Sequence, residues 1–163
     1  MTNDERHTAH HEAGHAVIAR VLGLSCGGAS IISEEGHSRG HSVIDDPRFS
    51  WQRGDGPKRQ AADAFCVALY AGYESEFACI DDFENGDHVD RERATGCLAW
   101  AGVRGARFVG DDIWDRHERR LREKAGRLVK DHRLTIERVA AALIERRTLD
   151  AGEIDVLMTA GDR

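Results

Sequence analysis

Residues 7–17 read HTAHHEAGHAV and contain four of the nine histidines of the chain. Within this stretch His11, Glu12 and His15 form the pattern H-E-x-x-H. Residues four apart lie one turn above each other on an α-helix, so a helix would direct both imidazoles toward one ion and place the Glu12 carboxylate beside them. The pattern predicts a zinc site, provided that the rest of the chain supplies a third protein ligand.

The chemistry of such a site is hydrolysis by a metal-activated water. A catalytic zinc leaves its fourth position to water and lowers the pKa of that water to ~7. Glu12 is the candidate general base that accepts the water's proton as a carbonyl is attacked. Since the pattern fixes only three positions, a histidine-rich helix without a metal is the alternative, and imidazole ligands also suit iron, cobalt or nickel. We expect His7 and His10 at the surface or behind the ligands.

The third ligand must come from farther along the chain. The extension H-E-x-x-H-x-x-G-x-x-H is absent, because residue 21 is valine. The downstream candidates are Glu74, Glu76, Asp87, His88 and Asp90. The last three precede or open a predicted helix, where the helix dipole alone also favours acidic residues. The residues by themselves leave this choice open.

The pattern along the chain predicts a mainly α (α+β) fold of about six helices in a single domain, residues 1–163. Helices are expected at 4–23, 58–78, from about 89, at 111–131, 133–146 and 151–160. In the last of these, Asp150 and Glu153 form a predicted capping box. Two β-prone runs, ASIIS and HSVID, flank a turn-rich segment and predict a small hairpin or sheet near the H-E-x-x-H helix. Residues 46–57, DPRFSWQRGDGP, are expected to be an exposed loop.

The composition indicates a globular protein. Of the 163 residues, 40% are hydrophobic and 32% charged, and the polar N-terminus lacks the features of a signal peptide. We therefore expect a cytoplasmic protein with no membrane segment. The four cysteines are scattered without a C-x-x-C pair, which favours buried, reduced thiols over disulfides or a cysteine-bound metal.

The charge is unevenly distributed. The chain has a net charge of −6, yet residues 104–147 carry 13 lysines and arginines against 8 acidic residues. Acidic and basic residues alternate there, which is typical of solvated helix faces with ion pairs. A helical domain that binds nucleic acid or a partner through this segment is the competing hypothesis, and its binding would weaken steeply with salt. Since no recognition motif supports it, we expect no nucleic-acid partner.

Five segments, in order from about residue 8 to 158, resemble the peptidase domain of the FtsH-type AAA+ zinc proteases. AHHEAGHAVIARVLG resembles the family's zinc helix, and ASIISEEGHSRGHSVI its hairpin, in which a glycine opens the second strand. VALYAGYESEF is similar to the A-G-R-x-A-E-E helix, and DHVDRERATGCLAW to the segment that carries the third ligand. The closing helices end in TLDAGEI, similar to the family's T-L-x-x-x-E-I.

The resemblance implies a zinc-dependent endopeptidase that acts on peptides or unfolded proteins. Carried over by position, His11 and His15 match the histidine ligands and Glu12 the general base. Asp90 matches the aspartate ligand, because DRERAT aligns with the family's Asp-x-x-x-Ala-Thr. A catalytically inactive binding or regulatory module of the same fold is the alternative.

The sequence also departs from the family. It contains no G-x-x-x-x-G-K-[ST] phosphate loop, so we expect a stand-alone peptidase without an ATPase module. A separate AAA+ unfoldase as partner and an oligomeric assembly are both compatible with this. Tyr73 replaces the arginine of A-G-R, and residues 46–57 form an insertion. These changes bear on substrate range and assembly more than on metal binding.

Overall fold

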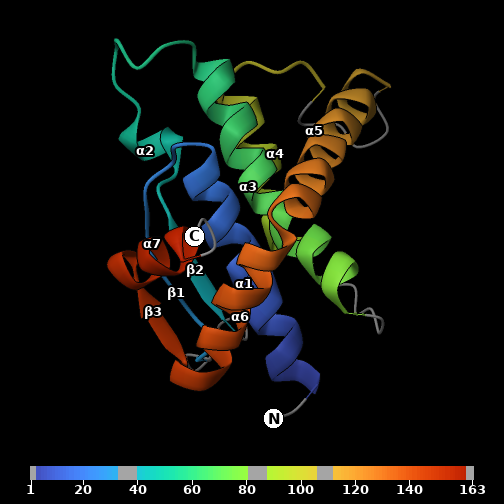
Figure 1. Ribbon diagram of the computed structural model, residues 1–163. Helices are drawn as coiled ribbons and strands as arrows, with labels where there is room; N and C mark the ends of the chain where they lie inside the picture. Colours follow the sequence, from blue (N-terminus) through green and yellow to red (C-terminus); the bar gives the residue numbers. More distant parts are fainter. Residues whose placement is uncertain (1–2, 33–39, 81–87, 106–111, 161–163) are drawn as a thin grey trace.

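The computed structural model describes residues 3–32, 40–80, 88–105 and 112–160 (Figure 1). Within these ranges it contains seven helices and one three-stranded sheet, which confirms the expected mainly α fold. In chain order the elements are α1 (Asn3–Val21), β1 (Cys26–Ser30), β2 (His41–Ile44), α2 (Pro47–Ser50), α3 (Lys58–Cys79), α4 (His88–Trp100), α5 (Asp112–Asp131), α6 (Arg133–Arg146), β3 (Thr148–Asp150) and α7 (Ala151–Thr159).

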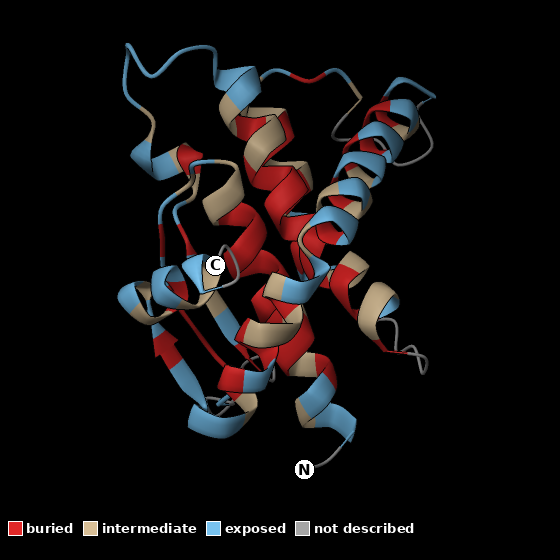
Figure 2. Cartoon of the chain, viewed as in Figure 1, coloured by how far each residue is buried: buried red, intermediate tan, exposed pale blue. Residues whose placement is uncertain are grey.

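Helix α1 runs through the middle of the molecule and packs against α3, α6 and the sheet. Its middle is buried on all sides, as Figure 2 shows. Small residues make this possible: a Cβ added to Gly14 would lie 2.5 Å from the carbonyl oxygen of Ala71 on α3. At the end of α1, Gly23 has a φ of 74° and the Leu24 N–H donates to the Ala19 carbonyl over 2.9 Å. This is a Schellman ending, for which glycine is the favoured residue.

The sheet lies beside α1 and has the strand order β2-β1-β3, with both outer strands antiparallel to β1. Ala29 of β1 is paired with Ser42 on one side and with Leu149 on the other. Two antiparallel strands are present as predicted, and β2 lies where HSVID was expected to form a strand. Strand β1 lies earlier than the ASIIS run and shares only Ala29 and Ser30 with it. Residues 33–39 lie outside the described residues. The sequence did not predict β3, because a three-residue strand has too little alternation to be recognised and pairs with a partner far away in the chain.

Residues 46–57 are not wholly a loop, so this expectation was wrong for four residues. Pro47–Ser50 form the short helix α2. The Asp46 carboxylate accepts a hydrogen bond from the Arg48 N–H over 2.9 Å, and proline occupies the first helical position. Both are helix-start signals, which the turn-rich composition of the segment obscured.

The later helices follow the predicted boundaries closely. The capping box of α7 is present: the Glu153 N–H donates to Asp150 over 2.8 Å, and the Asp150 N–H donates to Glu153 over 2.9 Å. Part of the basic charge of α5 is paired, since Glu118 accepts from Arg91 of α4 over 2.9 Å and from Arg122 over 3.1 Å. Some of the alternating charges of this region therefore form ion pairs, as the sequence predicts.

All four cysteines are free, and three of them are buried, in agreement with the expected reduced thiols. None of the helices in the described part of the chain combines the length and the apolar character that crossing a bilayer requires.

Candidate metal centre

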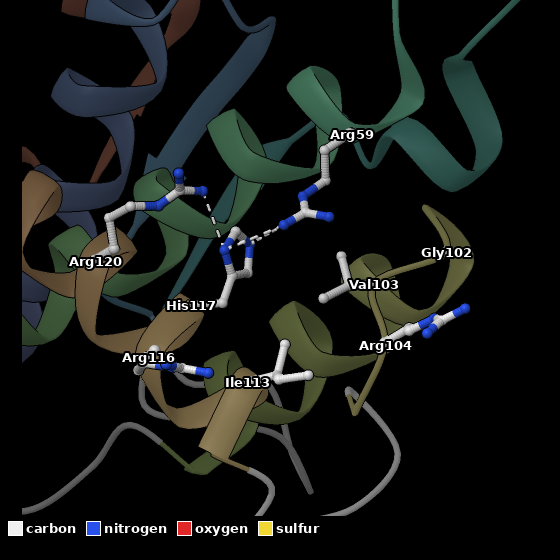
Figure 3. Close-up of a pocket in the computed structure, with 8 residues that line it drawn as sticks. All are labelled: Arg59, Gly102, Val103, Arg104, Ile113, Arg116, His117 and Arg120. Atoms are coloured by element: carbon white, nitrogen blue, oxygen red, sulfur yellow. Dashed lines mark hydrogen bonds between the residues drawn. The ribbon is translucent and has the colours of Figure 1, made fainter.

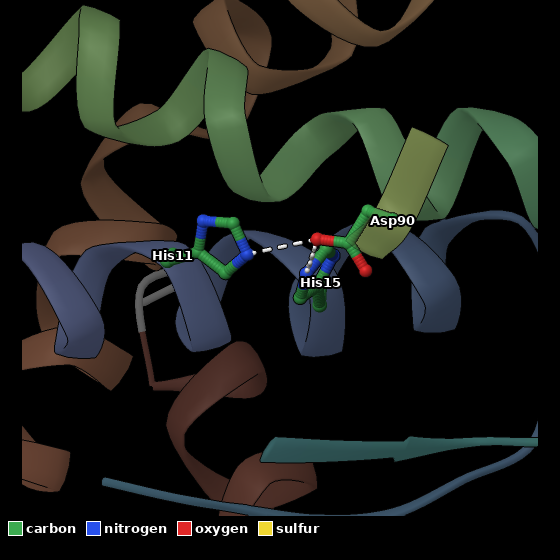
Figure 4. A group of neighbouring side chains, drawn as sticks. All are labelled: His11, His15 and Asp90. Carbon is green, nitrogen blue, oxygen red and sulfur yellow. Dashed lines mark hydrogen bonds and ion pairs between the residues drawn. The ribbon is translucent and has the colours of Figure 1, made fainter. Parts of the chain in front are cut away.

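Three predicted ligands meet between α1 and α4 (Figure 4). His11 and His15 project from successive turns of α1, with their rings perpendicular and their centroids 4.5 Å apart. Asp90 lies in the first turn of α4 and is buried. Its Oδ2 atom lies 3.0 Å from Nε2 of His11 and 3.1 Å from Nε2 of His15. Residues about eighty positions apart thus form one cluster.

The other ring nitrogen of each histidine, Nδ1, already makes a hydrogen bond to another residue. His11 Nδ1 lies 2.5 Å from Oε1 of Glu76 on α3, and His15 Nδ1 lies 2.9 Å from the carbonyl oxygen of Ala68. Both oxygens are acceptors, so each Nδ1 must carry the proton and donate it. In a neutral imidazole Nε2 is then a bare lone pair. Two lone pairs therefore face a carboxylate oxygen, an arrangement that requires positive charge between them.

A divalent metal ion fits this arrangement. Metal-bound histidines usually donate their second N–H to a carboxylate or a backbone carbonyl, which fixes the tautomer, as Glu76 and Ala68 do here. Ligand atoms ~2.0–2.1 Å from a tetrahedral zinc lie roughly 3.3 Å from each other. The two distances from Asp90 Oδ2, 3.0 and 3.1 Å, are close to that spacing. Two nitrogens and one carboxylate oxygen are also a common donor set for a catalytic zinc.

The electrostatics favour a cation at the same place. Burial lowers the pKa of His11, but the hydrogen bonds with Asp90 and Glu76 outweigh it and raise that pKa to about 10. Burial would raise the pKa of Asp90, but the charge of His15 and the hydrogen bonds with both imidazoles hold it well below its usual range. The surroundings therefore stabilise the Asp90 carboxylate together with a positive charge at Nε2, whether proton or metal supplies it.

Glu12 lies beside this cluster and is held by the sheet. It is buried, and its Oε2 accepts a hydrogen bond from the Ser42 hydroxyl of β2 over 2.7 Å. A Cβ added to Gly40 would lie 2.8 Å from the Ser30 carbonyl oxygen and 3.1 Å from Cγ of Glu12. Only glycine lets the chain just before β2 approach Glu12 so closely. The sequence did not identify Ser42, because its role depends on strand register.

Gly72 is a second residue that sequence reasoning missed. A Cβ added to it would lie 2.5 Å from Cε1 of His15 and 2.9 Å from Cε1 of His11. The backbone of α3 thus forms a floor under both imidazoles, and a larger residue would displace them. The A-G pair in the A-G-R-like segment was the available signal.

The remaining candidates have other places. Glu76 contacts the Nδ1 side of His11 rather than the Nε2 side, and its Oε2 lies 3.1 Å from Nδ1 of His7. Glu74 lies against Gly126 of α5, and His88 is exposed at the start of α4. Asp87 lies outside the described residues.

His7 and His10 are not surface residues. Both are buried, because α1 is enclosed along most of its length. His7 lies behind the cluster, where it shares the Glu76 carboxylate with His11. Nδ1 of His10 lies 2.8 Å from the Arg6 carbonyl oxygen, and burial lowers the pKa of its imidazole. The expectation of surface positions was therefore wrong, whereas a place behind the ligands is right for His7.

Comparison with known proteins agrees with the motifs. No protein-family profile matches the chain. It is 28% identical to the ATP-dependent zinc metalloprotease FtsH 1 of Thermomicrobium roseum over 92% of its own length and 28% of the relative's. It is 30% identical to FtsH 1 of Symbiobacterium thermophilum over 98% of its length and 30% of the relative's. It is 30% identical to FtsH of Thermus thermophilus over 92% of its own length and 28% of the relative's.

The chain therefore spans less than a third of the length of these curated relatives. The match nevertheless covers more than nine-tenths of the chain itself. The relatives' names support zinc as the metal and a protease-like function at the level of the family. Over more than nine-tenths of its length this chain is similar to the FtsH zinc metalloproteases, which is consistent with an FtsH-like peptidase domain.

Proposed function

We propose that this chain is a zinc-dependent metalloendopeptidase in which His11, His15 and Asp90 hold the metal and Glu12 is the general base. One observation carries the proposal: two imidazoles with committed Nδ1 protons direct their Nε2 atoms at one oxygen of Asp90. The buried Glu12 carboxylate beside them supports a hydrolytic role over a purely structural metal.

Each residue of the centre has a distinct task. When bound, zinc supplies Lewis-acid chemistry: it makes water a better nucleophile near neutral pH and polarises the peptide carbonyl. The Ser42 hydroxyl donates a hydrogen bond to Oε2 of Glu12, which remains a carboxylate, and Oε1 is left to accept the proton of the attacking water. Glu76 and the Ala68 carbonyl keep both imidazoles in the tautomer whose lone pairs point to one place.

The sheet offers a way to hold the substrate. In the described sheet β2 is an outer strand, and its Ser42 contacts Glu12. An extended peptide added to the free edge of β2 would pass next to the general base. Backbone hydrogen bonds read no particular side chain, so this mode suits peptides and unfolded proteins. A separate AAA+ unfoldase would supply such substrates from folded proteins.

Substitution of Glu12 tests the mechanism. Glu12→Gln keeps the size of the side chain and removes the base, so we expect about one zinc per chain to be retained and casein cleavage to fall at least about a hundredfold. Zinc is measured by elemental analysis. The matched control is Glu145→Gln, the same change at an exposed position of α6. Cleavage by Glu12→Gln at the parent rate would show that the assigned role is wrong.

The same assays separate the enzyme from the non-catalytic alternative. A wild-type protein that binds zinc but leaves casein and a peptide library uncut, with and without added zinc, would be a binding module. A protein that cuts and stops cutting when zinc is chelated is the proposed peptidase.

A further inference from the structure

A second charged site lies between α3, the segment after α4, and α5 (Figure 3). It is a hollow of about 410 Å³, and four arginines line it. We call it the arginine hollow, after Arg59, Arg104, Arg116 and Arg120. It shares no lining residue with the metal centre.

His117 of α5 forms the buried base of the hollow, and Figure 3 shows Arg59 and Arg120 converging on it. Its Nε2 lies 3.0 Å from a carboxylate oxygen of Asp63 and therefore donates to it. Its Nδ1 lies 3.0 Å from Nη2 of Arg120 and 3.2 Å from Nη2 of Arg59. Arginine only donates, so Nδ1 is an acceptor and His117 is neutral. Burial lowers the pKa of this imidazole, in keeping with that state.

The described residues that line the hollow carry more positive charge than their described neighbours neutralise. Asp63 pairs with both Arg59 and Arg120, each over 3.3 Å, so a single carboxylate serves two guanidinium groups. Both also approach the single lone pair of His117 Nδ1, which leaves further N–H groups on each to bind something else. Among the described residues that line the hollow, none is acidic. Such an excess in a chain with a net charge of −6 requires an explanation.

We propose that the arginine hollow binds a small phosphate-bearing organic molecule. The planar guanidinium group matches the oxygens of a phosphate in pairs, and four of them around one hollow suit a dianion better than a single carboxylate. Asp63 and His117 hold Arg59 and Arg120 in place, so two of the donors are positioned before the ligand arrives.

The shape of the hollow points to a ligand with an apolar part. The side chains of Val103 and Ile113 contribute apolar lining beside the guanidinium groups. A bare phosphate would leave this surface uncovered, whereas a nucleoside or another organic group could contact it. The concave shape and the overall acidity of the chain favour a small ligand over a nucleic-acid strand.

Titration of the full chain tests this proposal. Inorganic phosphate and adenosine monophosphate are added separately at constant ionic strength, and binding is followed by calorimetry and by amide chemical shifts. We expect both to bind and the nucleotide to bind more tightly. Arg59→Gln and Arg116→Gln should each weaken binding about fivefold or more, because each removes a charge-assisted hydrogen bond. Arg127→Gln is the matched control, at an exposed position of α5 outside the hollow.

The outcomes are distinct. The proposal is supported if both probes bind and only the substitutions in the hollow weaken them, while circular dichroism shows the variants folded. It is overturned if neither probe binds at 10 mM (roughly the upper limit of a weak specific site), or if the control weakens binding equally. Preferential binding of a DNA oligonucleotide, weakened equally by Arg127→Gln, would also overturn it and indicate a diffuse basic face instead. Metal content and peptide cleavage play no part in this test, so it stands apart from the proposed peptidase function.

Discussion

Two histidines of this molecule, His11 and His117, have opposite electrostatic surroundings. His11 lies between the carboxylates of Asp90 and Glu76, and its pKa is raised to about 10. His117 lies between Arg59, Arg120 and the single carboxylate of Asp63, and its pKa is lowered. Burial lowers the pKa of both imidazoles, so the difference comes from the neighbours.

This difference shows what each site can bind. Around His11 two carboxylates demand positive charge, and two Nε2 lone pairs can share a metal ion with Asp90. Around His117 the imidazole is already an acceptor for arginine, and the surplus charge is positive, so an anion is the complementary ligand. Substitutions at each site test this contrast between a cation site and an anion site.

Removal of the Asp90 carboxylate should have the largest effect on zinc affinity. Asp90→Ala leaves two imidazoles without their shared carboxylate, so zinc affinity should fall by more than about a hundredfold, beyond the usual effect of losing a partner behind a ligand. Peptide cleavage should be lost with it. Competition with a zinc-binding dye measures the affinity, and Asp131→Ala at the exposed end of α5 is the control. Unchanged affinity would mean that another residue is the third ligand.

Loss of the carboxylate behind His11 should have a smaller effect. In Glu76→Gln a neutral amide replaces the carboxylate that accepts the hydrogen bond from His11 Nδ1, so zinc affinity should fall about 10–100-fold. The same dye competition measures this change. Glu74→Gln, two residues away and facing α5, should leave the affinity unchanged. Equal losses in the two variants would indicate a general effect of charge on α3 rather than a contact with His11.

A methyl group under the imidazoles tests the floor of the centre. Gly72→Ala places a Cβ within 2.5 Å of His15, so we expect a loss of about 1–3 kcal/mol in the free energy of unfolding and weaker zinc binding. Urea denaturation measures the free energy of unfolding. In Gly152→Ala the new Cβ would lie 3.4 Å from Asp150, an ordinary contact, so this control should stay close to wild type. A fully stable Gly72→Ala protein with normal zinc affinity would contradict the close approach of α3.

The smallest expected effect is on the pH dependence of the free energy of unfolding, to which His117 and His11 should contribute in opposite directions. A folded-state pKa of His117 below its ordinary 6.5 means that the unfolded chain binds more protons just below that pH. The stability contributed by neutral His117 is thus present above pH 6.5 and is lost as the pH falls through the folded-state value. Its slope is at most about 1.4 kcal/mol per pH unit.

The metal-free protein should show the opposite trend from His11. Its raised pKa contributes stability that is complete below pH 6.5 and lost as the pH rises toward about 10. Chemical denaturation of chelator-treated protein between pH 5 and 9 measures the free energy of unfolding and shows both its loss toward acidic pH and its loss toward alkaline pH. His117→Gln should reduce the pH dependence of the free energy of unfolding only on the acidic side. A reduction on the alkaline side instead would show that the two histidines are wrongly assigned.

Much of the fold could be predicted because its signals are local. The limits of α6 are those read from the sequence, and the Asp150–Glu153 capping box forms as its spacing predicts. Strand β3 and helix α2 were missed, since one depends on a distant partner and the other is a single turn inside a turn-rich segment. The burial of His7 was missed for a related reason: nothing within α1 indicates that α3 covers it with Glu76.

The spacing within H-E-x-x-H is enough to put His11 and His15 on one side of a helix with Glu12 beside them, because the helical repeat brings residues three and four apart together. The sequence also narrowed the third ligand to a few acidic residues and one histidine, and the resemblance selected Asp90. The packing of the elements, in contrast, is needed to know that Asp90 faces Nε2 of His11, that Glu76 faces its Nδ1, and that Ser42 contacts Glu12. The same holds for the convergence of Arg59 and Arg120 on His117. All these pairings join separate elements of the fold. Those of the metal centre also depend on how closely glycine lets α1, α3 and the sheet approach one another.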